Sequence, residues 1–178
     1  AGEGRPTIVL MGDSQGSMYG SLLVEIAKEQ GLNLNVISDA GGNPIPPSEL
    51  YRDWIALLRR RKPRVTIVAI AWDRLNADRA LLDETLEGVF KESETCILIG
   101  QVPHLPNYAT REKFRETGLV PIYEDAEVKQ KRGEANRLLE KYKSPDCRVL
   151  SVDPYVVDEA GGIMFTDEAG RQIYHDKT

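Results

Sequence analysis

Features that point to a membrane span, a nucleic-acid partner or a disulfide framework are scarce in this sequence. Its 178 residues include only two cysteines and two histidines, and the net charge is −5. No apolar run reaches the ~18 residues that indicate a membrane-spanning helix, and the start shows no charged segment followed by the apolar stretch of a signal peptide. An acidic chain lacks the basic footprint of nucleic-acid binding, so we expect no nucleic-acid partner.

The two cysteines, Cys96 and Cys147, do not have the spacing of a zinc site, and we expect no metal. The first strand is followed by neither a G-x-G-x-x-G fingerprint nor the lysine of a phosphate-binding loop, so we expect no nucleotide cofactor. Each cysteine stands at the start of an apolar segment. They are either two small buried side chains or, if these segments are neighbouring parallel strands, a disulfide.

The overall composition, 41% hydrophobic and 29% charged, is that of a globular protein. A chain of 178 residues suits one domain with one core, so we expect residues 1–178 to form a single domain. Because the first strand already starts near Thr7, we interpret this domain as a piece of a longer chain.

Apolar segments alternate with segments of helical periodicity along the whole chain. We predict strands over residues 7–11, 32–37, 65–71, 96–102 and 148–152. We predict helices over residues 17–30, 48–61, 78–91, 110–116 and 125–142, and an irregular tail after residue 153. Ser48 is placed to cap its helix, and Gly31 to end the first one.

This alternation predicts an α/β fold, a three-layer α/β/α arrangement around a parallel sheet of about five strands, of the flavodoxin-like type. Ligands of such sheets bind at the carboxyl ends of the strands. The segments that follow the predicted strands are rich in Gly, Ser, Asn, His and Asp, and they include GDSQGS, SDAGGNP and WDRLN. We therefore expect the functional site at that edge of the sheet.

The segment GDSQGS places Ser14 just after the first strand, at the start of a helix. Free backbone N–H groups and the helix dipole favour negative charge there, as an acyl-transfer oxyanion requires. Ser14 is therefore either a nucleophile or only a helix cap. We expect Asp13 to turn inward and bond the backbone rather than take part in chemistry.

Several segments together resemble the SGNH (GDSL-like) hydrolase and acyltransferase superfamily. VLMGDSQGSMYG (9–20) is similar to its first block, DAGGN (39–43) holds its second-block glycine, VAIAWD (68–73) stands at its third block, and GRQIYHDKT (170–178) is similar to the start of its last block. The resemblance implies an SGNH-type fold. It places the nucleophile at Ser14, the acid of the triad at Asp176, and oxyanion donors at the backbone N–H groups of Ser14 and Gly42.

The third block departs from the family, because Trp72 stands where an oxyanion-binding asparagine is usual. Loss of such a donor lowers rates by ~10²- to 10³-fold in other enzymes. Asn43 and Asn76 are candidates to replace it, and the alternative for each is a loop asparagine that bonds its own backbone. Trp72 itself is either a core residue or a platform for a sugar ring.

The base is the second departure. The matching histidine would directly follow Thr178, and the sequence given supplies only His104 and His175. His175 adjoins Asp176 and is expected to face away from it, because neighbouring side chains of an extended segment point to opposite sides. His104 follows the fourth strand and is either a structural residue or a substrate contact. Asp153, which precedes a proline, suggests a turn.

The resemblance is closest to SGNH domains that are fused to, or work beside, membrane acyltransferases that O-acetylate bacterial cell-envelope polysaccharides. It implies serine-dependent acetyl transfer from an acyl donor to a polysaccharide through an acyl-serine, a membrane acyltransferase as partner or fused domain, and a periplasmic or extracytoplasmic location. Two alternatives stay open: a stand-alone GDSL-type esterase, lipase or carbohydrate esterase, and a non-catalytic glycan-binding module.

A serine hydroxyl needs a base within hydrogen-bond reach, so we predict that the 178 residues alone hydrolyse p-nitrophenyl acetate at close to the uncatalysed rate. The release of p-nitrophenol measures this. A high rate that Ser14→Ala abolishes would contradict the prediction and would show that a base lies within these residues.

Overall fold

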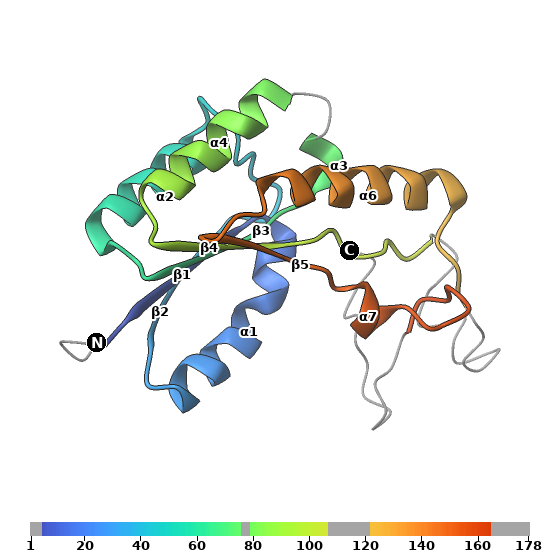
Figure 1. The fold of residues 1–178 in the computed structure, drawn as a ribbon, viewed down its shortest axis with the longest axis horizontal. Coiled ribbons are helices and arrows are strands. Elements are labelled where there is room, and N and C mark those ends of the chain that lie inside the picture. The colour runs from blue at the N-terminus through green and yellow to red at the C-terminus, as the bar shows by residue number, and fades with distance from the viewer. Residues whose placement is uncertain (1–4, 76–78, 107–121, 165–178) are drawn as a thin grey trace.

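A parallel β-sheet forms the centre of the molecule, in a computed structural model that describes residues 5–75, 79–106 and 122–164. The strand order is β2-β1-β3-β4-β5, and each neighbouring pair is parallel, which confirms the predicted sheet (Figure 1). The strands are β1 (Thr7–Gly12), β2 (Asn33–Ser38), β3 (Val65–Ala69), β4 (Thr95–Ile99) and β5 (Cys147–Leu150).

Helices cover the two faces of this sheet unequally. The long helices are α1 (Ser14–Glu29), α2 (Glu49–Arg61), α4 (Arg79–Lys91) and α6 (Ala126–Leu139); the short ones are α3 (Trp72–Leu75), α7 (Asp153–Val156) and the 3₁₀ turn η1 (Glu140–Tyr142). In Figure 1, α2, α4 and α6 lie above the sheet, and α1 and α7 lie below it. The chain steps from β1 to β2 in one direction and from β2 through β5 in the other, and right-handed crossovers then place the connecting helices on opposite faces.

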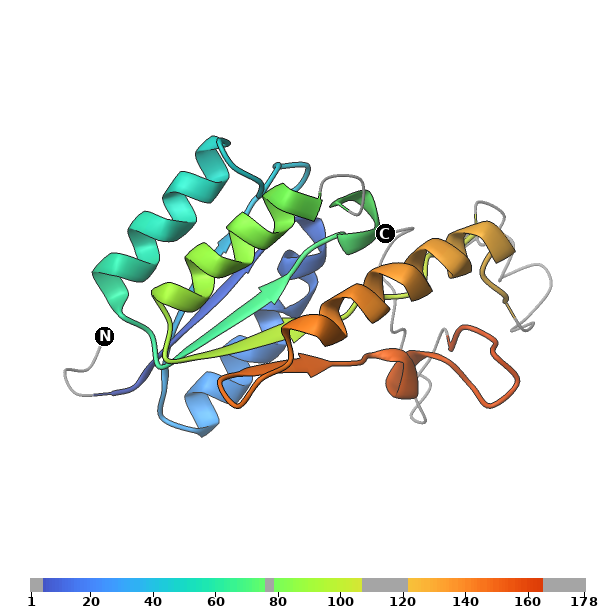
Figure 2. The same cartoon turned by 45° about the horizontal axis from the view of Figure 1, so that its top comes forward.

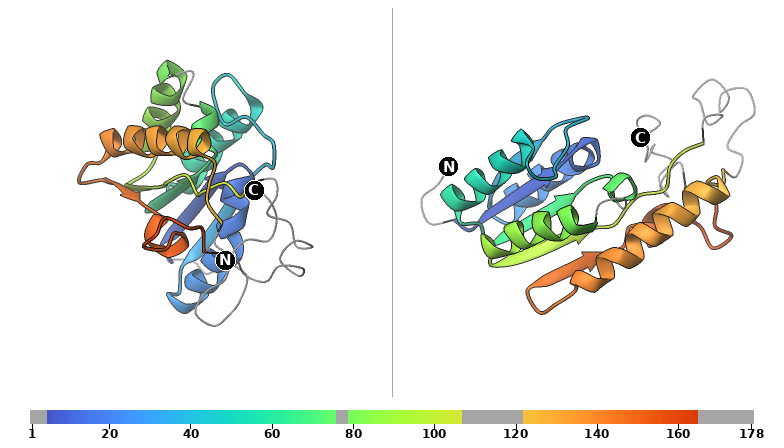
Figure 3. Two further views of the ribbon diagram at one scale, coloured as in Figure 1. Left: turned by 90° about the vertical axis from the view of Figure 1, so that its right-hand side faces the viewer. Right: turned by 90° about the horizontal axis from the view of Figure 1, so that it is seen from above.

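Alternation along the strands fills two apolar layers. Val9 and Met11 of β1 join the larger cluster under α2, α4 and α6, which includes Trp54 and Leu58 of α2. Leu10 points to the other face and joins a smaller cluster with Ile67 and Ile99. Figures 2 and 3 show the helices of the larger layer laid across the sheet, with α6 along the β5 edge. The larger core therefore lies on the α2, α4 and α6 face.

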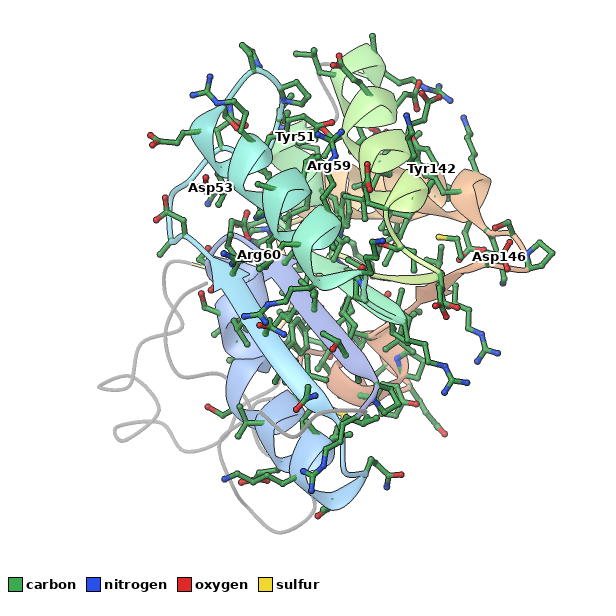
Figure 4. All side chains as sticks on the ribbon, turned by 90° about the vertical axis from the view of Figure 1, so that its left-hand side faces the viewer. Tyr51, Asp53, Arg59, Arg60, Tyr142 and Asp146 are labelled. Atoms are coloured by element: carbon green, nitrogen blue, oxygen red, sulfur yellow. The ribbon has the colours of Figure 1, made fainter. Side chains whose placement is uncertain are left out.

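The outward side of that helical layer is polar. Asp53, Arg59 and Arg60 project from α2 (Figure 4), and Arg59 Nε lies 3.0 Å from Glu92 Oε1. Such an exposed ion pair adds little stability, because solvent screens it. Tyr142 differs: its hydroxyl donates to the Asp83 carboxylate, and burial together with this bond raises the pKa of Tyr142. This contact ties η1 to α4.

Two predicted helix ends are confirmed. Ser48 caps α2, where its Oγ accepts a hydrogen bond from the Tyr51 N–H at 3.1 Å. Gly31 follows α1 with φ of +66°, a conformation that favours glycine because it has no Cβ.

Other element boundaries were predicted wrongly. Helix α1 begins at Ser14 and not at residue 17, because Asp13 caps it. Strand β3 ends at Ala69, two residues before its predicted end at residue 71, and a short helix starts at Trp72. The tail predicted to be irregular contains α7, which begins at Asp153 with a proline in its first turn, where proline's missing N–H costs nothing. The helix predicted over 110–116 lies outside the described residues.

The inner face of α1 is less covered than its periodicity predicts. Leu22 is 54% exposed and Ile26 is 38% exposed, whereas Ala27 is buried. Apolar periodicity marks the side of a helix that avoids water, but it does not supply the element that packs there. In the described part of the chain, no helix is long and apolar enough to cross a bilayer.

Cys96 and Cys147 are register partners on the neighbouring strands β4 and β5, as their positions predicted. Both are buried, and both are free thiols in the structure. A hydrogen bond to Cys147, with burial, raises the pKa of the Cys96 thiol, and the same bond lowers the pKa of Cys147. Both side chains are buried, so neither sulfur is accessible to a reagent in the native protein.

We therefore predict that both thiols react with Ellman's reagent in denaturant without reductant, and that neither reacts rapidly in the native protein. A denatured sample that releases thiols only after reduction would show a Cys96–Cys147 disulfide instead.

Candidate active site

Ser14 is held at a sharp strand-to-helix turn. Strand β1 ends at Gly12, Asp13 is the cap, and the partly buried Ser14 is the first residue of α1. A Cβ at Gly12 would collide with the Ala69 carbonyl oxygen and with the Cα of Gly16. Only glycine therefore lets β1, β3 and α1 meet this closely, and the meeting fixes where Ser14 starts its helix.

Asp13 joins this turn to the end of β3. Its side chain is buried, with 7% exposed. One carboxylate oxygen accepts a hydrogen bond from the Gln15 N–H at 2.9 Å, and the other accepts one from the Ala71 N–H at 2.9 Å. Hydrogen bonds of this kind to a carboxylate are roughly twice as strong as neutral ones. The prediction that Asp13 turns inward and bonds the backbone is confirmed.

The loop after β2 lies against the same turn. The Asp39 N–H donates to the Gly12 carbonyl at 3.2 Å, and the Ser17 hydroxyl donates to the Ser38 hydroxyl at 2.9 Å. The Gly42 N–H, the second predicted oxyanion donor, donates to the Asp39 carbonyl at 2.9 Å. An oxyanion would have to share or replace that bond.

Asn43 behaves as an ordinary loop asparagine. Its Oδ1 accepts a hydrogen bond from the Ile45 N–H at 3.0 Å, which is the side-chain turn that asparagine commonly makes. Its side chain is exposed in the same loop as Gly42. The carbonyl end of the Asn43 amide therefore has a structural role in this loop. The predicted role of Asn43 in substrate binding stays a prediction.

Trp72 is a core residue, so its predicted role as a substrate-binding platform is wrong. Only 1% of its surface is exposed, and its Nε1–H donates to the Ile99 carbonyl at 2.7 Å. This hydrogen bond satisfies the indole N–H and lets the large ring join the larger core cluster. Trp72, at the third-block position, therefore contributes to the packing of the core.

Beside Trp72, a polar cluster that the sequence did not predict as a unit occupies the carboxyl edge. His104 Nε2 lies 3.1 Å from Asp73 Oδ2 and 3.2 Å from Gln101 Nε2. Burial alone would raise the pKa of Asp73, but the hydrogen bond from His104, together with the neighbouring Arg74, outweighs burial, and the pKa lies below its usual value. Asp73 is therefore a carboxylate at neutral pH. Asp73 of α3 and two residues of the loop after β4 form this cluster, and no local motif signals it.

A buried ion network supports the loop that carries His104. Arg132 of α6 lies 2.9 Å from Glu124 and 2.6 Å from Asp153, and Glu124 also accepts a hydrogen bond from the His104 N–H at 2.9 Å. Burial alone would lower the pKa of Arg132, but its two acidic partners outweigh burial and raise it. Asp153, predicted as a turn residue, thus also joins α7 to α6.

A largely apolar hollow of about 1040 Å³ opens beside Ser14. Its lining includes Ser14, Met18 and Leu22 of α1, Ile99 of β4, and Leu150 and Tyr155 near the β5 edge. This is the face of the sheet that α1 covers incompletely. In the described ranges, no group of three His, Cys, Asp or Glu residues is placed to hold a metal ion.

The predicted acid Asp176, its neighbour His175, and Asn76 lie outside the described residues. The structure places Ser14 at the start of α1, beside the loop of Gly42 and Asn43, and the roles assigned to Ser14 and Asp176 stay predictions.

Because Asp13 satisfies two buried N–H groups, we predict that Asp13→Ala lowers the free energy of unfolding by about 1–3 kcal/mol for each N–H left unpaired. Urea denaturation measures the change. The matched control is Asp53→Ala on the exposed side of α2, where we expect less than about 0.5 kcal/mol. Equal effects of the two substitutions would show that Asp13 does not hold the turn.

Solved structures that include an acetyltransferase domain and TesA share this fold. The periplasmic domain of a Salmonella ser. Paratyphi A lipopolysaccharide acetyltransferase is 16% identical, with a TM-score of 0.69 over 94% of this chain and 74% of that one. TesA is 17% identical, with a TM-score of 0.51 over 93% of this chain and 88% of that one. At such low identities these likenesses establish the fold alone.

No curated protein sequence matches the chain significantly. A family model described as "SGNH domain (fused to AT3 domains)" matches residues 1–178. The match spans the segment of Ser14, the loop of Gly42 and the tail with Asp176. The chain belongs to the family of SGNH domains that are fused to AT3 domains.

Proposed function

We propose that this domain transfers an acyl group, as acetyl, to a hydroxyl of a bacterial cell-envelope polysaccharide through an acyl-Ser14 intermediate. The position of Ser14 carries the proposal: it is the first residue of α1, on a turn fixed by Gly12 and by the two hydrogen bonds of Asp13. Membership of the family supports acyl transfer or ester cleavage in general.

In the first step, Ser14 Oγ attacks the acyl carbon of the donor, and the bond from that carbon to the leaving group breaks. The hydroxyl proton passes to a base, which the family resemblance assigns to a histidine three residues after the acid Asp176. The base passes this proton to the leaving group. In the second step, an acceptor hydroxyl gives its proton to the base as its oxygen attacks the acyl carbon, the Oγ–acyl bond breaks, and the base returns a proton to Ser14 Oγ. These two steps need no oxidant, reductant or metal.

The site contributes charge stabilisation as well as a nucleophile. The negative charge on the carbonyl oxygen develops beside the N-terminus of α1, where the helix dipole and unpaired N–H groups favour it. We infer that the Ser14 N–H is one donor. The Gly42 N–H becomes a second donor if the oxyanion takes the place of the Asp39 carbonyl, and the Asn43 amide nitrogen is the side-chain candidate in the same loop.

The acceptor and the location rest on similarity. The structural relative from Salmonella is a lipopolysaccharide acetyltransferase periplasmic domain. We infer a similar setting for this domain: a polysaccharide acceptor outside the cytoplasm, and an AT3 domain, fused or associated, that supplies the acyl group. Hydrolysis by a GDSL-type esterase uses the same first step and differs only in that water is the acceptor.

We predict that Ser14→Ala, in the full-length natural polypeptide that carries this domain, lowers cleavage of p-nitrophenyl acetate by about 10⁴-fold or more, because the nucleophile is lost. Mass spectrometry of the wild-type protein should find an acetyl group on the peptide that contains Ser14.

Ser144→Ala is the matched control, because it removes a hydroxyl from an exposed position just before β5, at the opposite edge of the sheet from Ser14. Acetylated oligosaccharide as the product supports transfer, and free acetate alone supports hydrolysis. Full biological function of Ser14→Ala would instead support a non-catalytic glycan-binding module.

A further inference from the structure

His104 presents one free ring nitrogen in a fixed orientation. Its Nε2 lies 3.1 Å from Oδ2 of Asp73, which is ionised. A carboxylate only accepts, so it favours the tautomer with the proton on Nε2, in which Nδ1 keeps its lone pair. The Gln101 amide nitrogen, 3.2 Å from the same Nε2, is then a neighbouring donor and not a hydrogen-bond partner of the ring. No group among the described residues hydrogen-bonds that Nδ1. The His104 side chain is 25% exposed, so the ring is reachable by a ligand.

The surroundings of His104 are more rigid than an ordinary loop. The Gln101 N–H donates to Asn136 Oδ1 at 2.7 Å, and the Asn136 amide donates back to the Gln101 carbonyl at 3.3 Å. The His104 N–H donates to Glu124, which the buried Arg132 holds from its other side. Both the backbone and the ring of His104 are therefore set before any ligand arrives, which lowers the entropy cost of binding.

Asp73 has an unusual environment of its own. Its Oδ1 is buried and, within the described ranges, has no hydrogen-bond partner. A buried carboxylate with one unsatisfied oxygen costs stability. The cost is offset in part by the contact with His104, and this arrangement suits a carboxylate whose role is to orient the imidazole.

This pair lies at the same edge of the sheet as Ser14. The Asp13 carboxylate binds the Ala71 N–H, and Ala71 stands two residues before Asp73. Val102, two residues before His104, lines the hollow that Ser14 also lines. Strands β1 and β3 are direct neighbours, as are β3 and β4. The segments that carry Ser14, Asp73 and His104 therefore follow three adjacent strands.

We propose that Nδ1 of His104, oriented by Asp73, accepts a hydrogen bond from a hydroxyl of the carbohydrate acceptor and positions that acceptor for attack on acyl-Ser14. The inference rests on the proposed function and adds to it a binding residue for the second substrate. A lone-pair acceptor recognises a hydroxyl donor, and a sugar presents several of them. His104 thereby favours transfer to sugar over loss of the acyl group to water.

The experiment measures how the acyl-enzyme divides between water and sugar. Full-length protein is mixed with p-nitrophenyl acetate and increasing concentrations of the methyl glycosides of glucose, galactose, mannose, rhamnose and N-acetylglucosamine. Free acetate and acetylated glycoside are quantified in the same reaction, and their ratio is independent of how much enzyme is active. We expect His104→Ala to lower the ratio of transfer to hydrolysis by about 10-fold or more, the size of effect expected for one lost hydrogen bond of about 1.4 kcal/mol.

Two further variants separate binding from folding. His104→Gln keeps a hydrogen-bond acceptor of similar reach, and we expect it to restore part of the ratio. Asp73→Asn removes the charge that orients the ring, and we expect an intermediate loss with a raised KM for the glycoside. Lys141→Ala, on the exposed surface of η1, is the control. A purely structural role of His104 would lower both products equally and leave the ratio unchanged.

The outcomes separate the two proposals. If Ser14→Ala retains activity, the proposed function fails. If the wild-type protein forms acyl-Ser14 but its product ratio does not respond to His104 substitutions, or if it acetylates none of the glycosides, only the His104 proposal fails. If His104→Ala blocks formation of acyl-Ser14 itself, His104 acts on the first step, and the acceptor role is overturned.

Discussion

The buried carboxylate of Asp13 is the constraint on which the rest of the site depends. It binds one N–H from α1 and one from the segment that follows β3, and so joins two neighbouring strands at their carboxyl ends. Both N–H groups would otherwise be buried without a partner, which is costly. Gly12 makes the junction sterically possible, since any side chain there meets the Ala69 carbonyl. These two residues therefore fix where Ser14 begins α1.

A second network of polar contacts holds the same edge of the sheet near β4 and β5. Arg132 connects α6 with Glu124 and with Asp153 of α7, and Glu124 in turn holds the backbone of His104. A buried ion network of this kind is weak evidence for stability, because desolvation offsets much of the attraction. Its effect here is geometric: it fixes the loop after β4, which lies beside Asp73 of α3. Ser14 and the His104 cluster are thus held by separate networks on one sheet.

Most of the fold could be predicted from the sequence because its signals are local. Continuous apolar segments identified the strands, Ser48 and Gly31 marked helix ends, and alternation of strands and helices indicated a parallel sheet. Boundaries failed where a tertiary contact decided them. Helix α1 starts at Ser14 because Asp13 caps it, and β3 stops at Ala69 because the chain turns to bury Trp72.

The predictions for the candidate site divide in the same way. The sequence by itself determined the position of Ser14 after β1, the inward role of Asp13 and the resemblance to SGNH proteins, because short-range order in the chain encodes each of them. Only the tertiary structure decided that Trp72 is a core residue, that the Gly42 N–H is already bonded to Asp39, and that Asp73 and His104 meet. Asp73 belongs to α3 and His104 to the loop after β4, and the register of β3 against β4 brings them together. Contacts between segments distant in sequence follow from packing, which no local pattern records.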